Sequence, residues 1–200
     1  MSAQKDNPNV WKEFVPVAMH VRKWDSGGYK DAYARPEFDE MLTAYQRYWK
    51  ASDVYPPTVA ANSIDWSGWS RGQSVPSDPL KTIGVLKVSS PKFSNKYSVE
   101  FAVKGPDASG PFTLHACLLS FGVSSRPVDG KNRGKALNHN FIVTLYRNQP
   151  ITPNREGVYT GLVDVVPPKG IRRAHYGIAF WITKTGSPVS VQSTGGYLPE

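Results

Sequence analysis

Alternation of apolar and polar residues marks the clearest strand of the chain. Apolar side chains occupy every second position from Tyr97 to Val103, and polar or small ones fill the positions between them. A β-strand repeats every two residues, so this pattern predicts a strand over 97–104 with one buried face. Turn residues fill 105–111, and 112–121 is apolar on both faces. We therefore expect an outer strand that forms a hairpin with a more central strand.

Five further strands are predicted, which gives seven in the second half of the chain. Proline and glycine separate them, and no helical pattern lies between them. Short strands at regular spacing favour a sandwich, jelly roll or barrel. The expected fold is therefore mainly β, with an antiparallel β-sandwich or jelly-roll-like domain of about seven to eight strands over 81–200. The seven predicted strands are 83–88, 97–104, 112–121, 139–146, 158–166, 176–183 and 189–192.

An extension over residues 1–80 precedes this domain and holds the clearest helical pattern. Pro36 occupies a favoured first position, and acidic residues follow it in the first turn, where they suit the helix dipole. Apolar residues then recur every three or four positions as far as Trp49, so a helix is predicted over 36–51. A strand is predicted over 17–24, and 52–80 is expected to be a connection rich in proline and tryptophan.

Aromatic residues concentrate in this extension. Five of the six tryptophans and five of the ten tyrosines lie within residues 1–69. Such side chains can line a subunit interface, hold the extension against the sheet, or stack on bases or sugars. We favour the first two, because basic residues are not interleaved with the aromatic ones. The candidate subunit contacts are Tyr45, Trp49, Trp66 and Trp69.

Positive charge concentrates in the second half of the chain. The net charge is +8, and residues 101–200 carry 11 basic against 5 acidic side chains. Loops rich in lysine and arginine bind phosphates readily, although they can also be simply solvated. The expected partners are therefore RNA or single-stranded nucleic acid, or an anionic membrane surface. The candidate anion-binding residues are Arg126, Lys131, Arg133, Lys135, Lys169, Arg172 and Arg173.

Candidate catalytic and metal-binding residues are few. Cys117 and His115 lie two positions apart on the predicted central strand, where burial would make them inert. No paired cysteine or histidine spacing predicts a metal site, and no phosphate-binding loop is present. We expect no catalytic residue, metal or cofactor. An undetected hydrolase built on Asp164, His139 or Cys117 is the third alternative considered.

The location is predicted from what the sequence lacks. The N-terminus has no apolar signal region, and no apolar run approaches the roughly 18 residues of a membrane helix. A single cysteine allows no disulfide within the chain and suits a reducing compartment. A soluble protein is expected, located in the cytoplasm or, for a viral protein, in the host cytoplasm or the virion.

In broad organisation the chain resembles a small viral structural protein, with a helical, aromatic arm before a basic β-sandwich over 81–192. This resemblance implies a self-assembling coat or matrix-like protein that forms a homo-oligomer and has no enzymatic activity. Coat proteins often begin with a basic arm, whereas residues 1–21 hold only Lys5 and Lys12, which favours the matrix type. The alternative prediction is a β-sandwich module that binds a carbohydrate or a membrane surface through exposed aromatic residues.

Overall fold

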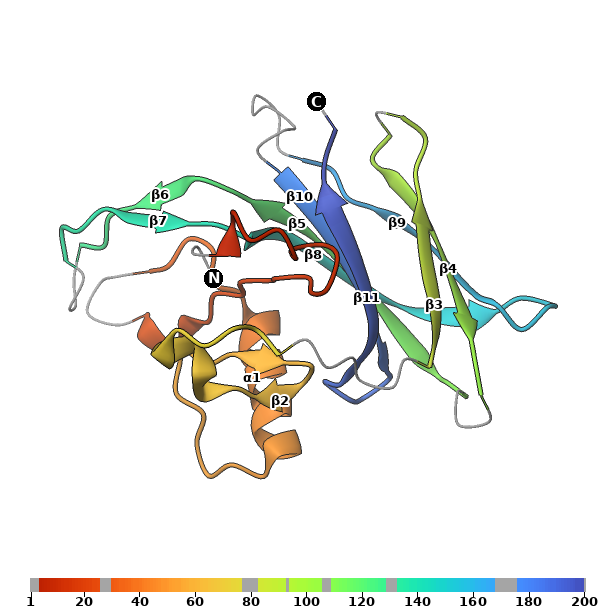
Figure 1. Ribbon diagram of the computed structural model, residues 1–200, viewed down its shortest axis with the longest axis horizontal. Coiled ribbons are helices and arrows are strands. Elements are labelled where there is room, and N and C mark those ends of the chain that lie inside the picture. The colour runs from red at the N-terminus through yellow and green to blue at the C-terminus, as the bar shows by residue number, and fades with distance from the viewer. Residues whose placement is uncertain are drawn as a thin grey trace.

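The fold is mainly β, with a layer of N-terminal chain packed against one large sheet (Figure 1). The computed structural model describes residues 4–25, 30–76, 83–92, 94–105, 109–128, 133–167 and 176–199. The strands of the large sheet are β3 (Gly84–Ser89), β4 (Lys96–Val103), β5 (Phe112–Ser120), β8 (Ile142–Pro153), β9 (Tyr159–Asp164), β10 (Tyr176–Lys184) and β11 (Ser190–Tyr197). The smaller elements are η2 (Arg22–Trp24), α1 (Pro36–Trp49), β1 (Ala60–Ala61), β2 (Ile64–Asp65), η3 (Ser67–Arg71), β6 (Val123–Ser125) and β7 (Leu137–His139).

The large sheet is antiparallel and has the order β11-β10-β5-β8-β9-β4-β3. The twelve-residue strand β8 joins its two halves, because its first part pairs with β5 and its last two residues pair with β9. The sheet curls until its edges approach, and Gln192 Nε2 of β11 donates a hydrogen bond to Gly84 O of β3 at 3.1 Å. The prediction of a mainly β, antiparallel sandwich is therefore confirmed.

An inner core fills the space between the two halves of the curled sheet. It joins side chains of β4 and β9 to side chains of β5 and β10. Two aromatic pairs cross this space: Phe101 lies edge-on to Phe112 at 5.2 Å, and Tyr97 packs against Phe180 at 5.4 Å between ring centroids. Burial of each such ring from water contributes about 2 to 3 kcal/mol, so the inner core holds the two halves together.

A second core lies on the outer face of β5, β8 and β10, under the N-terminal layer. It is formed by Cys117, Leu119 and Ala179 from the sheet and by Phe38 from α1. Phe38 is 1% exposed, and its ring lies edge-on to Tyr146 at 5.6 Å. The two apolar faces of β5 therefore have different partners, one in each core.

Helix α1 begins at the predicted residue and ends two residues before the predicted end. Lys50 follows the helix with a left-handed φ of 54°, and its N–H donates to carbonyl groups of the last turn. Arg35 precedes the helix, and its Nη2 donates to Thr144 O of β8 at 2.7 Å. This contact fixes the beginning of α1 on the sheet.

Two local predictions are wrong. Strands β4 and β5 form no hairpin, because β8 and β9 lie between them in the sheet. The two strands belong to opposite halves of the sandwich, so the 105–111 connection crosses from one half to the other. Residues 17–24 form no strand either: only Ala18 pairs with the sheet, through an isolated bridge to Ile142, before the chain turns into η2.

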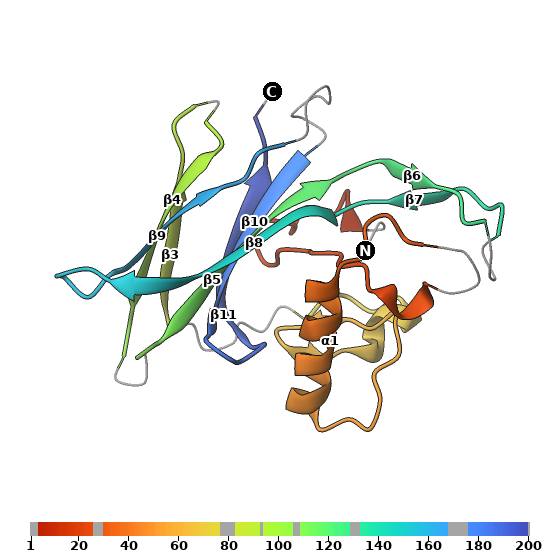
Figure 2. The same ribbon diagram turned by 180° about the vertical axis from the view of Figure 1, so that it is seen from behind.

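A hairpin that was not predicted extends the two central strands. It is formed by β6, which follows β5, and β7, which precedes β8. The backbone bends where the hairpin leaves the sheet. One bend is at Gly122, between β5 and β6, with a φ of 64°, and the other is at Phe141, between β7 and β8, with a φ of 59°. Gly122 N donates to Asn140 Oδ1 at 2.9 Å across the bend. Figures 1 and 2 show this hairpin reaching beyond the end of the large sheet.

Among the described residues, no helix is both long and apolar enough to cross a bilayer. The cytoplasmic location stays a prediction.

One buried histidine links the stability of the sheet to pH. His115 on β5 is hydrogen-bonded to Tyr146 Oη at 2.7 Å and to Thr183 Oγ1 at 3.0 Å. Its ring stacks on Trp181, with centroids 4.9 Å apart and planes 3° from parallel. Burial lowers the pKa of His115 to about 4, so the folded protein keeps this ring neutral.

We predict that acid destabilises the wild-type fold through this group. The unfolded chain binds a proton at His115 below pH about 6.5, whereas the folded chain does so only near 4, so the free energy of unfolding falls as the pH is lowered between these values. The slope of the free energy of unfolding against pH should approach ~1.4 kcal/mol per pH unit in this range. His115→Gln keeps a polar partner for Tyr146 and Thr183 but cannot ionise. Urea denaturation of this variant should show a free energy of unfolding that depends less on pH than that of the wild type. An unchanged slope would contradict the prediction.

Candidate functional site

An open groove of about 750 Å³ crosses the N-terminal layer. It lies between the 22–34 segment and one face of α1, and residues 53–54 close one side. The lining is Arg22, Lys23, Asp25, Lys30, Asp31, Ala34, Asp39, Leu42, Thr43, Gln46, Asp53 and Val54. Three basic and four acidic side chains dominate it, so this N-terminal groove is strongly polar and close to neutral.

Two ion pairs hold the walls of the N-terminal groove. Arg22 donates from its backbone N–H to Asp39 Oδ1 at 2.8 Å and from Nε to Asp39 Oδ2 at 2.5 Å. Lys23 Nζ donates to Asp53 Oδ1 at 3.0 Å and to Val54 O at 3.1 Å. The hydrogen bond and charge of Lys23 lower the pKa of Asp53. Both aspartates therefore present carboxylate oxygen atoms toward the groove, Asp39 through two bonds to Arg22 and Asp53 through an exposed pair with Lys23.

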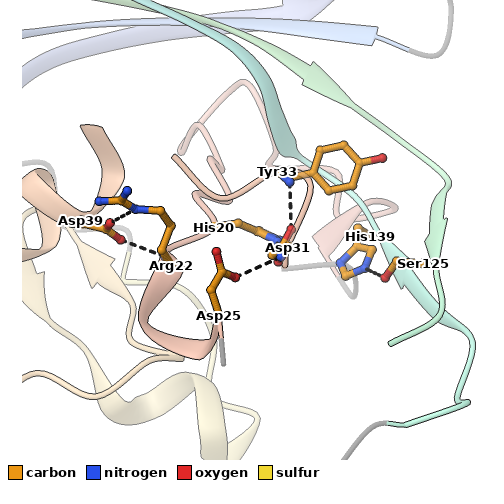
Figure 3. A network of polar contacts seen from close by, with 8 residues as sticks. All are labelled: His20, Arg22, Asp25, Asp31, Tyr33, Asp39, Ser125 and His139. Carbon is orange, nitrogen blue, oxygen red and sulfur yellow. Dashed lines mark hydrogen bonds and ion pairs between the residues drawn. The ribbon is translucent and has the colours of Figure 1, made fainter. Parts of the chain in front are cut away.

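Asp31 is the centre of a network at one end of the groove (Figure 3). Its Oδ2 lies 2.7 Å from His20 Nδ1, its Oδ1 accepts a hydrogen bond from Tyr33 N at 2.9 Å, and its own N–H donates to Asp25 Oδ1 at 3.0 Å. Burial acts to raise the pKa of Asp31, but the bonds to His20 and Tyr33 and the charge of His20 outweigh it and lower the pKa. Asp31 therefore keeps its negative charge.

His139 extends this network to the β6–β7 hairpin. Its Nε2 lies 2.7 Å from Ser125 Oγ on the paired strand, and its ring meets His20 edge-on with centroids 5.2 Å apart. Burial and the charge of His20 lower the pKa of His139, although Asp31 acts in the opposite direction. The groove and the base of the hairpin are thus joined through two histidines from distant parts of the sequence.

The network contains the parts of a catalytic triad without its connectivity. A triad needs an acid hydrogen-bonded to the histidine that activates the serine. Here Ser125 is bonded to His139, but the carboxylate of Asp31 is bonded to the other histidine, His20. Among the described residues, no group of three or more histidine, cysteine, aspartate or glutamate side chains could hold a metal ion.

The structure describes only part of the predicted anion-binding set. Arg126, Arg133 and Lys135 are exposed near the end of the β6–β7 hairpin. Gly134 N donates to Pro127 O at 2.8 Å, which brings the two sides of the hairpin together there. The other predicted residues lie outside the described part of the chain: Lys131, Lys169, Arg172 and Arg173.

The predicted subunit contacts pack within the N-terminal layer. Tyr45 and Trp49 stack with ring centroids 4.9 Å apart, and Trp49 Nε1 donates to Ser63 O at 2.8 Å. The indole of Trp66 packs directly on Gly68: a Cβ added to Gly68 would lie 2.2 Å from Nε1 of Trp66. Trp69 remains 40% exposed. The internal packing accounts for most of this set, and a role in subunit contact stays a prediction.

The residues considered for a hydrolase are not brought together. Cys117 is fully buried, and burial raises the pKa of its thiol. Asp164 is exposed at the end of β9, where it faces Lys96 in the strand register. Of these three residues, only His139 belongs to the groove network. Sequence reasoning missed its partners Asp31 and His20, because the groove joins segments that no local pattern connects.

Comparison with known proteins identifies a family and similar folds. A family model described as "Protein of unknown function (DUF1223)" matches residues 1–182. No curated protein sequence matches the chain. HBP35 of Porphyromonas gingivalis is 10% identical with a TM-score of 0.56, over 85% of this chain and 61% of that chain. A protein of Agrobacterium tumefaciens with a known crystal structure is 15% identical with a TM-score of 0.53, over 92% of this chain and 80% of that one.

A domain of the outer membrane lipoprotein Omp28 of P. gingivalis is also similar, at 12% identity and a TM-score of 0.31, over 60% of this chain and 92% of that domain. The chain spans about three-fifths of the length of HBP35. At these identities the likeness concerns the fold alone.

The prediction of a viral coat or matrix-like protein that binds nucleic acid is wrong. The two structures with TM-scores above 0.5 are bacterial proteins, and neither they nor the matching family gives any support for a capsid, a matrix protein or RNA binding. The N-terminal extension was predicted to form subunit contacts or to cover the sheet, and part of it packs on the outer face of the sheet.

The edge contact between the two histidines predicts a measurable coupling. Replacing His20 with Gln removes a neighbouring positive charge, so the pKa of His139 should rise toward its ordinary value of 6.5. NMR titration of the histidine ring protons measures this shift, and His115, which is buried in the sheet, serves as the internal control. A pKa of His139 that stays constant or falls in His20→Gln would contradict the arrangement.

Proposed function

Since the chain belongs to the DUF1223 family, which is described only as of unknown function, its activity has to be inferred from its own site, and we propose that it is a non-enzymatic carbohydrate-binding module. The N-terminal groove takes the sugar. The observation that carries this proposal is the set of fixed aspartates in an open polar groove next to an exposed tyrosine.

The polar groups of the groove match the hydroxyl groups of a sugar. A carboxylate accepts several hydrogen bonds, and only part of this capacity is used by the internal partners of Asp39 and Asp53. Arg22 and Lys23 hold these carboxylates and supply further donors. Groups held in place before binding lose little conformational entropy when the ligand arrives, so the ion pairs favour affinity.

Tyr55 provides an aromatic surface beside these groups. Its ring is 63% exposed, and Lys23 Nζ lies 5.1 Å from the ring centroid. The residues that precede it, Asp53 and Val54, line the groove. Aromatic rings present an apolar face and a polar edge, so Tyr55 can pack against the C–H face of a sugar whose hydroxyl groups bond to the carboxylates.

The charge balance of the groove restricts the class of sugar that it can bind. The lining holds three cations and four carboxylates, and two of the cations form ion pairs within it, Arg22 with Asp39 and Lys23 with Asp53. A highly charged ligand would have to displace these pairs. We therefore expect neutral or N-acetylated oligosaccharides rather than polyuronic acids.

The proposal is tested with cellohexaose, chitohexaose and oligogalacturonate as probes in isothermal titration calorimetry. One of the two uncharged probes should bind, and Tyr55→Ala should weaken that binding at least about tenfold, because stacking on an aromatic ring is worth roughly 1 to 3 kcal/mol. Asp39→Asn should also weaken it, since the change removes a charged acceptor and its bond to Arg22.

Tyr48→Ala is the matched control. Tyr48 is 51% exposed but lies on the opposite side of α1 from the groove residues Asp39, Thr43 and Gln46. The control should bind as the wild type does. Equal losses in Tyr48→Ala and Tyr55→Ala, or no binding of any probe, would refute the proposal.

A further inference from the structure

The β6–β7 hairpin projects from the molecule as an extension of its two most central strands. Its base is fixed by the pairing of Val123 with His139 and by the bond between Ser125 and His139. Both views of the molecule show it reaching beyond the end of the large sheet (Figures 1 and 2), while the ring contact of His139 with His20 places its base against the N-terminal layer. A projecting element of this kind can reach a surface that the rest of the molecule does not touch.

The outer part of the hairpin combines positive charge with an exposed apolar side chain. Residues 121–140 hold four basic side chains and one acidic side chain. Arg126, Arg133 and Lys135 are exposed. Val128 is 67% exposed, which is the highest value among the large hydrophobic residues of the described chain. The bond from Gly134 N to Pro127 O at 2.8 Å keeps this apolar side chain close to the cations.

We propose that the end of the β6–β7 hairpin docks on an anionic lipid surface. Val128 enters the boundary between head groups and acyl chains, and Arg126, Arg133 and Lys135 contact lipid phosphates. Each lysine or arginine side chain at the surface of an anionic bilayer strengthens binding about fivefold. Three such side chains therefore strengthen it about a hundredfold. This inference is independent of the carbohydrate proposal, because the hairpin end contributes no residue to the lining of the N-terminal groove.

The exposed apolar side chain is the reason to prefer a lipid surface over a dissolved polyanion. A dissolved polyanion is bound by charge alone and gains nothing from a valine that stands in water. A bilayer offers phosphates and, a few ångströms deeper, an apolar medium. The basic side chains can contact the phosphates while the apolar side chain enters the medium below them.

The first experiment measures co-sedimentation with vesicles of phosphatidylcholine alone and of phosphatidylcholine with phosphatidylglycerol. The wild type should bind only the anionic vesicles, and added salt should weaken the binding. The triple variant Arg126→Ala, Arg133→Ala, Lys135→Ala should bind about a hundredfold more weakly. The control variant Lys12→Ala, Lys87→Ala, Lys104→Ala removes the same charge from exposed positions elsewhere and should bind nearly as the wild type does.

The second experiment places a reporter at the apolar position. Val128→Cys can be labelled with an environment-sensitive fluorophore, because the native Cys117 is fully buried. The emission should shift to the blue on anionic vesicles and stay unchanged on neutral ones. Val128→Ser keeps the charge of the protein and should still weaken vesicle binding.

Three results would overturn the inference. Equal losses in the two triple variants would show that net charge alone causes binding. An emission spectrum of the labelled Val128→Cys variant that does not shift to the blue on anionic vesicles would show that the label stays in water and that this position does not enter the bilayer. Competition by soluble polyaspartate, together with unchanged vesicle binding of Val128→Ser, would identify an acidic protein as the better partner. Circular dichroism of each variant confirms that the fold is retained.

Discussion

The burial of strand β5 on both faces is the constraint on which the rest of this structure depends. A strand whose two faces are apolar needs cover on each side, and the curled sheet provides it on one side only. The inner side chains of β5 pack against β4 and β9, while Cys117 and Leu119 on the outer side need α1 and the segment before it. The N-terminal layer is therefore a structural part of the β domain. Its position, in turn, brings His20 and Asp31 against a hairpin that lies more than a hundred residues later in the chain.

The buried polar groups around His115 are satisfied in ways that order the sheet, whereas Trp11 Nε1 and Arg35 Nε of the N-terminal layer are buried without a hydrogen-bond partner among the described residues. His115 uses both ring nitrogens, one with Tyr146 and one with Thr183, and Asn148 Nδ2 donates to the same tyrosine oxygen at 3.2 Å. Burial raises the pKa of Tyr146 to about 12, so this phenol stays protonated and can take part in the chain of bonds. A half-satisfied network would cost more than an apolar core, and a complete one fixes a single arrangement of the strands. The stacked rings of His115 and Trp181 belong to this arrangement and not to a reactive site.

Local patterns in the sequence located the seven strands of the large sheet but not their order, and they missed the β6–β7 hairpin. Alternation over 97–103 and the doubly apolar run over 112–121 correctly located β4 and β5, and Pro36 located the beginning of α1. Their pairing could not be derived in the same way, because it depends on which face of β5 meets the extension. The candidate site was predicted least well. Asp31 and Asp39 look like ordinary surface residues in the sequence, and only the fold brings Asp31 to His20 and Asp39 to Arg22. The basic residues over 126–135 could be named from the sequence because charge is visible without a fold, and their role in binding an anion stays a prediction.

The continuity of β5 with β6 and of β7 with β8 has a mechanical consequence. Any load on the hairpin passes through the bend at Gly122 and Phe141 into two strands that share a ladder from Phe112 opposite Ile151 to Ser120 opposite Ile142. A pull along these strands shears many backbone bonds at once instead of opening them one by one. The hairpin is therefore anchored in the centre of the sandwich, where β5 and β8 lie side by side.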